Sequence, residues 1–501
     1  MKRTYLLISC MSVALSVFAQ DAYDAWKFAQ QDLFGTARYV GMSGAFAALG
    51  GDPSAVKDNP ASLGVFRKTD VSITLDVNIE RTNTNWNSRD NYTARATRVS
   101  CGQANWVQTF NTLNAEQGLV SHSFMLGYHR LKNHDRELMS KAISQPVSFT
   151  DFLAEYSDGL TEADMAGGFD NVEIPWLTVM GYDAYIINPD STNPGHWTSV
   201  LSPNEHVNST FNLSERGWTD EVNVGWGANL SNKFYFGLSL DLRLMQYRKD
   251  MTYSETFEQG GGFDINTYYR ASGVGFNAVG GFIYRPTNWL RLALSAQTPT
   301  IMNYRENYDA QIRQWGITTS SVTETTPQAT RISYRLTNPW RLTAGLATTF
   351  STRALLSFQY DYEAYHTMRY SANSGNASGW SNENDQIRSQ LKDAHTFRAG
   401  AEFFITNSFA IRAGYAFKTW FNSAVPNRYL AVNTMRTDTE FGIIDMQHYI
   451  GAGLGFRNNW LIAEIAYQYR ISKEKMAPFN NVDPFSVAAT SHRIVFTFGI
   501  K

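Results

Sequence analysis

The stretch FYFGLSLDLRL (Phe234–Leu244) decides the fold, because apolar residues alternate with small or polar ones through most of it. Successive side chains of a β-strand point to opposite faces, so one face of this strand is apolar and the other polar. The same alternation recurs in VSITLDVNI (71–79), LSFQYDY (356–362) and LIAEIAYQY (461–469). The pattern predicts strands with one face against an apolar medium.

The connections between these strands come in two lengths. Very short turns that contain Asn join strand pairs at 230–234, 285–289, 405–409 and 457–460. Long polar loops are expected between the pairs, at 249–267, 299–338, 367–394, 419–446 and 471–490. Short turns at one end and long loops at the other are typical of an outer-membrane β-barrel.

Alternation alone does not separate a barrel from a two-sheet sandwich. Many of these segments reach about 10 residues, which suits a tilted membrane strand better than a soluble one. Aromatic residues at strand ends are expected to form two membrane-interface girdles. They are Trp289, Trp340 and Trp460 on the short-turn side, and Tyr247, Tyr365 and Tyr469 on the long-loop side.

Counting strands through this rhythm predicts an all-β fold, a 14-stranded antiparallel transmembrane β-barrel. The even number places both ends of the barrel on the same side. A lumen of this width exceeds what side chains alone can fill, so another segment is expected inside. Segment 329–337 is an alternative to 98–110 as a strand. The predicted strands are 69–80, 98–110, 121–131, 221–230, 234–248, 268–284, 289–298, 339–349, 354–366, 395–405, 408–418, 447–457, 460–470 and 491–501.

Residues 1–19 have the form of a secretory signal peptide, with a basic start, an apolar run and Ala19 before the expected cleavage. Cys10 lies in a sequence similar to a lipoprotein box, but much of the apolar run follows it. Without residues 1–19 only Cys101 remains, so a disulfide within the chain is excluded. The net charge of −2 gives no indication of nucleic-acid binding.

Residues 20–68 precede the first strand and do not alternate. Composition alone favours an ordinary N-terminal linker. However, GAFAALGGDPSAVKDNPA (Gly44–Ala61) resembles the N-terminal hatch of the FadL/TodX family of outer-membrane hydrophobic-compound transporters, whose Asn-Pro-Ala falls on 59–61. Stretches 276–295, 397–402 and 411–415 are similar to hairpins of that family's barrel.

This resemblance implies a hatch at 20–68 in the lumen of a barrel at 69–501. It implies passive uptake of hydrophobic small molecules such as long-chain fatty acids, without catalysis or cofactor, in the outer membrane of a Gram-negative bacterium. Asn59, Pro60 and Ala61 are the expected gate, and the ligand is expected to leave sideways through the wall. The expected partners are the hydrophobic ligand, outer-membrane lipid and the barrel assembly machinery, around a monomer.

The longest predicted loop, 132–220, carries apolar residues and a short helix within 149–165. Long loops of this kind are usually functional. Two interpretations stay open: the apolar side chains capture a ligand outside, or they pack the loop on the barrel rim. The candidates are Phe152, Leu153, Tyr156 and Trp176.

Several charged residues fall on the lumen face of the predicted strands, since a charge facing lipid costs about 2–4 kcal/mol at mid-membrane. Glu402 and Arg412 lie opposite each other on neighbouring strands, so an ion pair is expected. Most of these charges are expected to hold the hatch. The lumen candidates are Asp241, Arg243, Arg398, Glu402, Arg412 and Glu464.

No catalytic motif and no paired metal-ligand spacing occurs among the nine His residues. Two alternatives to transport remain. One is a surface receptor or adhesin that holds haem or a host molecule. The other is a barrel enzyme that hydrolyses lipid.

Overall fold

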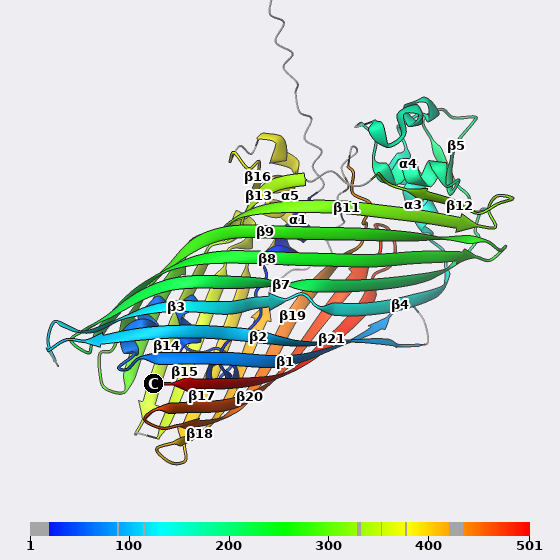
Figure 1. Cartoon of the computed structure of the whole chain (residues 1–501). Helices are drawn as coiled ribbons and strands as arrows, with labels where there is room; N and C mark the ends of the chain where they lie inside the picture. Colours follow the sequence, from blue (N-terminus) through cyan, green and yellow to red (C-terminus); the bar gives the residue numbers. More distant parts are fainter. Residues whose placement is uncertain are drawn as a thin grey trace, which may run out of the picture.

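The computed structural model describes residues 20–501 except 88–89, 114–115, 172, 328–331, 352, 376–377, 420–427, 429 and 431–433. The described chain forms one closed antiparallel barrel with the N-terminal segment inside it (Figure 1). The predicted signal peptide lies outside the described residues. None of the described helices is long and apolar enough to cross a membrane.

In the described part of the chain, nineteen strand segments form the barrel sheet. Five of these extend neighbouring strands, which leaves the fourteen strands that the sequence predicts. The five are β4 (Arg136–Gln145), β11 (Ile301–Trp315), β12 (Val322–Thr325), β13 (Ile332–Thr337) and β16 (Arg369–Ser371). Strand β1 pairs with both β2 and β21, which closes the ring. The ring consists of β1 (Asp70–Asn85), β2 (Tyr92–Asn111), β3 (Leu119–Asn133), β7 (Val207–Leu230), β8 (Phe234–Phe257), β9 (Gly262–Tyr284), β10 (Leu290–Gln297), β14 (Arg341–Phe350), β15 (Ala354–Glu363), β17 (Ala394–Phe404), β18 (Phe409–Thr419), β19 (Phe441–Arg457), β20 (Leu461–Ala477) and β21 (Phe485–Ile500).

The two faces of the wall differ as the alternation predicts. Leu238 and Leu240 on β8 are 53% and 61% exposed, whereas Ser239 and Asp241 between them are 0% and 3% exposed. The outside of the barrel is therefore apolar and the inside polar. Trp289, Trp340 and Trp460 are exposed near the short turns, where one girdle was expected.

The girdle predicted at the long-loop end is wrong in part. Tyr247 and Tyr365 are buried, because both pack in an aromatic cluster inside the barrel. Tyr469 does lie on the outside, where its ring lies 5.0 Å from the His492 ring between centroids, tilted by 38°. The outward belt at this end contains hydrogen-bonded Tyr–His pairs: Tyr360–His395, Tyr415–His448 and Tyr467–His492.

The strands also continue beyond the predicted loop boundaries. Strands β7 and β8 each have 24 residues, so the predicted loop 249–267 shrinks to the turn between Phe257 and Gly262. The predicted loop 299–338 contains β11 (Ile301–Trp315), β12 (Val322–Thr325) and β13 (Ile332–Thr337). Similarly, β20 and β21 shorten 471–490. Beyond the belt the outward side chains become polar and apolar ones such as Phe211 and Tyr253 lie on the buried inner face. The hydropathy pattern of the belt is therefore reversed before the strands end.

Residues 132–220, predicted as one loop, contain β4 (Arg136–Gln145) and the first half of β7. Between these strands lie α3 (Phe149–Ser157), η3 (Glu162–Asp170), α4 (Trp176–Asp183), β5 (Ile187–Pro189) and β6 (Trp197–Ser199). Ser148 and Asp151 begin α3 with a capping box. This insert sits at the end of the barrel away from the C-terminus (Figure 1). At the same end lie η4 (Tyr365–Thr367), β16 (Arg369–Ser371), η5 (Ser378–Trp380) and α5 (Ser381–Gln390).

Residues 20–68, here called the lumen segment, run through the barrel. They form α1 (Ala22–Ala29), α2 (Ala37–Gly41), η1 (Pro53–Lys57) and η2 (Pro60–Val65). Two rows of wall glycines on adjacent strands make room for them. Gly227, Gly237 and Gly281 face the turn at Asn59–Leu63, and Gly400, Gly414 and Gly451 face Val40–Met42. A Cβ at Gly237 would lie 2.1 Å from the Pro60 carbonyl carbon, so only glycine lets the two backbones approach this closely.

The close approach of the lumen segment to the wall glycines can be tested at two neighbouring positions. A Cβ at Gly281 would meet Asn59 Oδ1 at 1.9 Å, whereas one at Gly280 meets nothing within 4 Å. We expect Gly281→Ala to lower the free energy of unfolding by about 1–3 kcal/mol through overpacking, and Gly280→Ala to change it by less than about 0.5 kcal/mol. Urea unfolding in detergent micelles measures both. Equal effects of the two substitutions would contradict a close contact between Gly281 and the lumen segment.

Candidate functional site

Two neighbouring strands of the wall, β2 and β3, stop pairing part of the way along their length. The β2–β3 ladder runs from Asn111–Ser121 to Gln103–His129 and ends there. Strand β2 continues to Tyr92 and stays paired with β1 alone. In the register with β1, Cys101, Val99 and Thr97 lie opposite Leu75, Val77 and Ile79. Because those three residues belong to the outer apolar belt, this ladder break lies within the height of the belt.

Beyond the break, the chain of β3 turns inward. A register shift against β7 occurs between Arg130 and Lys132, and β4 then pairs with β7 alone. Thr82, on the lumen face of β1, donates a hydrogen bond of 2.5 Å to the Glu137 carbonyl of β4. Strand β4 therefore lies against the lumen side of β1. Across the break, Arg98 Nε of β2 lies 3.4 Å from Asp135 Oδ2.

The lumen segment bonds directly to the strand that bends. The Asp32 N–H donates to the Leu131 carbonyl at 2.8 Å. Beside it, Lys132 Nζ donates to Gln30 Oε1 at 3.1 Å and to the Lys27 carbonyl at 3.3 Å. Residues 27–32 thus supply partners to β3 next to the break. The segment and the irregular part of the wall form a single hydrogen-bonded unit.

Two of the six predicted lumen charges, Arg398 and Glu402, bond the segment directly, and Arg412 and Glu464 belong to the Glu402 network. Arg412 bonds both Glu402 at 2.6 Å and Glu464 at 2.9 Å, so the expected Glu402–Arg412 pair is present. Arg38 of the segment joins this network through Glu402, at 2.6 Å. Arg398 Nη1 donates to Tyr39 Oη at 2.8 Å and contacts Asp58 at 3.3 Å.

The other two predicted charges bond to the wall. Asp241 accepts hydrogen bonds from Ser239 at 2.6 Å and from Asn277 at 2.7 Å. Arg243 pairs with Glu221 at 2.9 Å. Both are buried on the lumen face.

Asn59, Pro60 and Ala61 lie buried at the start of η2. The Asn59 carboxamide oxygen accepts from the Ala61 N–H at 3.0 Å and so caps η2. Its Nδ2 donates to the Ala47 carbonyl at 2.9 Å and to the Phe282 carbonyl of β9 at 3.3 Å. One side chain therefore ties two parts of the segment to the wall.

Helix α1 occupies the half of the lumen nearer the long loops. Its Phe28 lies among Tyr rings of the wall, 5.5 Å from Tyr247 and 5.5 Å from Tyr304 between ring centroids. The buried Arg436 donates a hydrogen bond to Asp24 Oδ1 of α1 at 3.1 Å. Burial raises the pKa of Asp21, which caps α1, to about 6, and Arg428 opposes this rise.

The predicted capture residues are not displayed. Phe152, Leu153 and Trp176 are buried. The Phe152 ring lies 5.4 Å from Phe479, in the connection between β20 and β21, and Tyr156 stacks on Phe152 at 6.1 Å. Of the two interpretations of this loop, the structure supports packing on the rim for these side chains.

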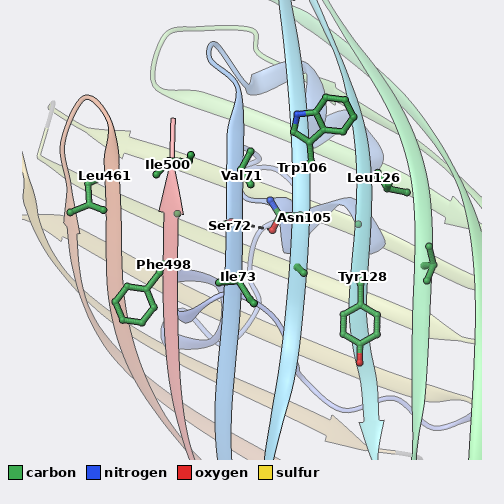
Figure 2. Close-up of a pocket in the computed structure, with 14 residues that line it drawn as sticks. Val71, Ser72, Ile73, Asn105, Trp106, Leu126, Tyr128, Leu461, Phe498 and Ile500 are labelled. Atoms are coloured by element: carbon green, nitrogen blue, oxygen red, sulfur yellow. Dashed lines mark hydrogen bonds between the residues drawn. The ribbon is translucent and has the colours of Figure 1, made fainter.

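A shallow apolar groove of about 740 Å³ runs along the outside of the same part of the wall. It begins where β2 and β3 are still paired and extends across β1 to β20 and β21 (Figure 2). Its apolar lining consists of Val71, Ile73, Ala104, Trp106, Leu126, Tyr128, Val222, Leu461, Phe498 and Ile500. The ladder break therefore adjoins an apolar outer surface.

No protein-family model and no curated protein matches this sequence. Solved structures match it over most of its length. The toluene transporter TodX of P. putida covers 94% of this chain and 99% of its own, at a TM-score of 0.53 and 13% identity. A Pseudomonas aeruginosa FadL homologue covers 94% and 98%, at a TM-score of 0.50 and 11% identity. At these identities, the likeness shows that the chain shares their barrel fold.

The bond between Asp32 and Leu131 can be isolated with two substitutions. Asp32→Asn removes the carboxylate that pairs with Arg470 but keeps the N–H, whereas Asp32→Pro removes both. We expect Asp32→Pro to unfold more easily than Asp32→Asn by about 1–3 kcal/mol, because the Leu131 carbonyl loses its partner. Urea unfolding of both variants measures the difference. Equal stability would show that the bond is unimportant.

Proposed function

We propose that this chain is an outer-membrane channel of a Gram-negative bacterium for passive uptake of hydrophobic small molecules, such as long-chain fatty acids. The observation that carries the proposal is the ladder break. It lies within the apolar belt, next to the lumen segment, and adjoins an apolar groove on the outside. Known proteins with this fold include a toluene transporter, which agrees with a hydrophobic cargo.

The proposed route starts at the long-loop end. There the apolar cluster between α3 and the barrel rim is filled by its own side chains in this structure and has to open to receive the molecule. The aromatic cluster around Phe28 comes next, and α1 occupies it in this structure. The exit is the ladder break, where a hydrophobic molecule passes into the membrane without crossing water.

In this proposal the lumen segment is the hatch and Asn59, Pro60 and Ala61 belong to its gate. The support is the Asn59 side chain, which bonds both the segment and β9. The bond from Asp32 to Leu131 connects the same segment to the exit. A movement of the segment therefore changes the partners of the bent strand.

One contact bears on the lipid-hydrolase alternative. Ser144 Oγ lies 2.7 Å from His206 Nδ1 at the long-loop end. A serine nucleophile needs a base that a third group orients. No side chain of the described residues bonds to the other ring nitrogen of His206. The Ser144–His206 pair is weaker support for hydrolysis than the ladder break is for transport. If the chain does hydrolyse lipid, Ser144 is the residue to substitute.

Uptake into vesicles tests the proposal. We expect vesicles that contain the protein to take up a labelled long-chain fatty acid faster than empty vesicles, and to exclude a sugar of similar size. Binding without uptake would contradict transport and favour a receptor. Release of fatty acid from phospholipid that Ser144→Ala abolishes would favour the hydrolase.

A further inference from the structure

Four exposed cations lie together on the outside of the barrel, close to the ladder break. We call Arg81, Arg95, Lys473 and Lys475 the basic patch. Arg81 of β1 lies directly opposite Arg95 of β2. Lys473 of β20 lies opposite Ala488 of β21, which in turn lies opposite Asn83 of β1. Because neighbouring strands are about 5 Å apart, the long side chains of the patch reach a common area over β21.

Within the part of the chain that the structure describes, no acidic side chain pairs with the basic patch. The nearby outward positions hold Asn83, Thr93, Ala488 and Thr490. The acids of these strands point inward, where Glu80 pairs with Arg470 and Glu474 with Arg136. None of the four patch cations forms an ion pair with any residue that the structure describes.

Like charges directly opposite each other destabilise a strand pair. Several other exposed arginines have an acid beside them, although Arg270, which lies opposite Arg248, forms no ion pair with a residue that the structure describes. Arg216 pairs with Glu137, Arg248 with Asp250, Arg313 with Asp264 and Arg388 with Asp385. Arg81 and Arg95 differ from the opposite pair Arg248 and Arg270, in which Arg248 is bonded to Asp250, because neither of them pairs with a described acid. Their arrangement therefore fits an anion from outside the protein.

The position of the patch indicates which anion. Arg81 follows Ile79 by two residues, about 7 Å along the strand. Ile79 lies opposite His492, which contacts the Tyr469 ring and bonds to Tyr467. Aromatic side chains of this kind mark the membrane interface. The patch therefore lies just beyond the apolar belt, at the height of lipid headgroups.

We propose that the basic patch binds the phosphate groups of a lipid in the outer leaflet, beside the ladder break. This inference rests on the outer-membrane location proposed above. Arginine recognises phosphate with paired N–H donors, and lysine adds a point charge. Four cations without an acid match a headgroup with two phosphates better than the single carboxylate of a fatty acid. The bound phosphate also relieves the repulsion between Arg81 and Arg95.

Lipid binding by the full chain in detergent tests this proposal. The patch variant is Arg81→Gln, Arg95→Gln, Lys473→Gln and Lys475→Gln. A matched control makes the same change in charge at Arg216→Gln, Arg248→Gln, Arg313→Gln and Arg388→Gln, where each cation already has an acid. The probes are diphosphoryl lipid A, the same lipid without phosphates, a long-chain fatty acid and inorganic phosphate. Native mass spectrometry measures bound lipid, and gel mobility with and without heating shows that each barrel is folded.

We expect the patch variant to bind diphosphoryl lipid A at least about tenfold more weakly than the unmodified chain, since each surface cation adds to the attraction. The control should bind it within about twofold. Lipid without phosphates should bind equally weakly to all three proteins. If the quadruple variant does not fold, Arg95→Gln with Lys473→Gln should still weaken binding.

Equal binding of diphosphoryl lipid A by the patch variant and the unmodified chain would overturn the proposal. Inorganic phosphate or fatty acid that displaces the lipid at equal concentration would overturn the assignment to a lipid headgroup. The experiment needs no transport. A chain that binds lipid through the patch but fails to take up fatty acid would refute the proposed transport and leave the lipid site in place.

Discussion

The structure depends on one constraint: a polar backbone group inside an apolar membrane needs a hydrogen-bond partner within the protein. Most of the wall meets this constraint with its own ladder. At the β2–β3 break the ladder ends, and the strand beyond it bends inward. The Asp32 N–H then bonds to the Leu131 carbonyl. The lumen segment thus replaces a missing strand contact at the place where the wall is irregular.

The way the segment is held follows from the same constraint. The glycine rows let its backbone approach the wall, and the buried ion pairs fix where it sits. A buried ion pair adds little net stability, because desolvation offsets most of its attraction. The networks around Arg412 and Asp58 therefore act mainly by making one position of the segment more favourable than others. If the lumen segment is the hatch proposed above, this kind of attachment suits it, because it is specific without being very strong.

How much the sequence predicted depended on the range of the interaction. Period-two alternation is a property of each strand alone, so the strands, their number and the inward faces of Glu402 and Arg412 could be predicted. The continuation of β7 and β8 above the apolar belt could not, because there the outer face is polar and apolar residues such as Phe211 and Tyr253 lie on the inner face. Tyr247 was misassigned because a strand-end tyrosine suits a girdle and a buried cluster equally well.

No pattern in the sequence predicted the ladder break. It depends on which residues of β2 and β3 pair, and these strands carry ordinary alternation up to Gln103 and His129. The wall glycines, in contrast, do form a pattern that indicates a structural feature. Gly237 and Gly281 occupy lumen-facing positions in strands whose other residues alternate, and glycine at such positions indicates the close approach of another backbone. The residues that approach them are Asn59, Pro60 and Ala61. These three residues were singled out only because of the family resemblance.

The central claim is that cargo leaves through the ladder break, and bridging the break tests it most directly. Arg98→Cys and Asp135→Cys, with Cys101→Ser, place two thiols across the break for a reducible bifunctional reagent. Asp264→Cys and Arg313→Cys, on the ladder-paired β9 and β11, serve as the control. We predict that bridging 98 to 135 reduces fatty-acid uptake to the rate of empty vesicles, that reduction restores it, and that the control bridge has no effect. Unchanged uptake with the 98–135 bridge fully formed would contradict the account.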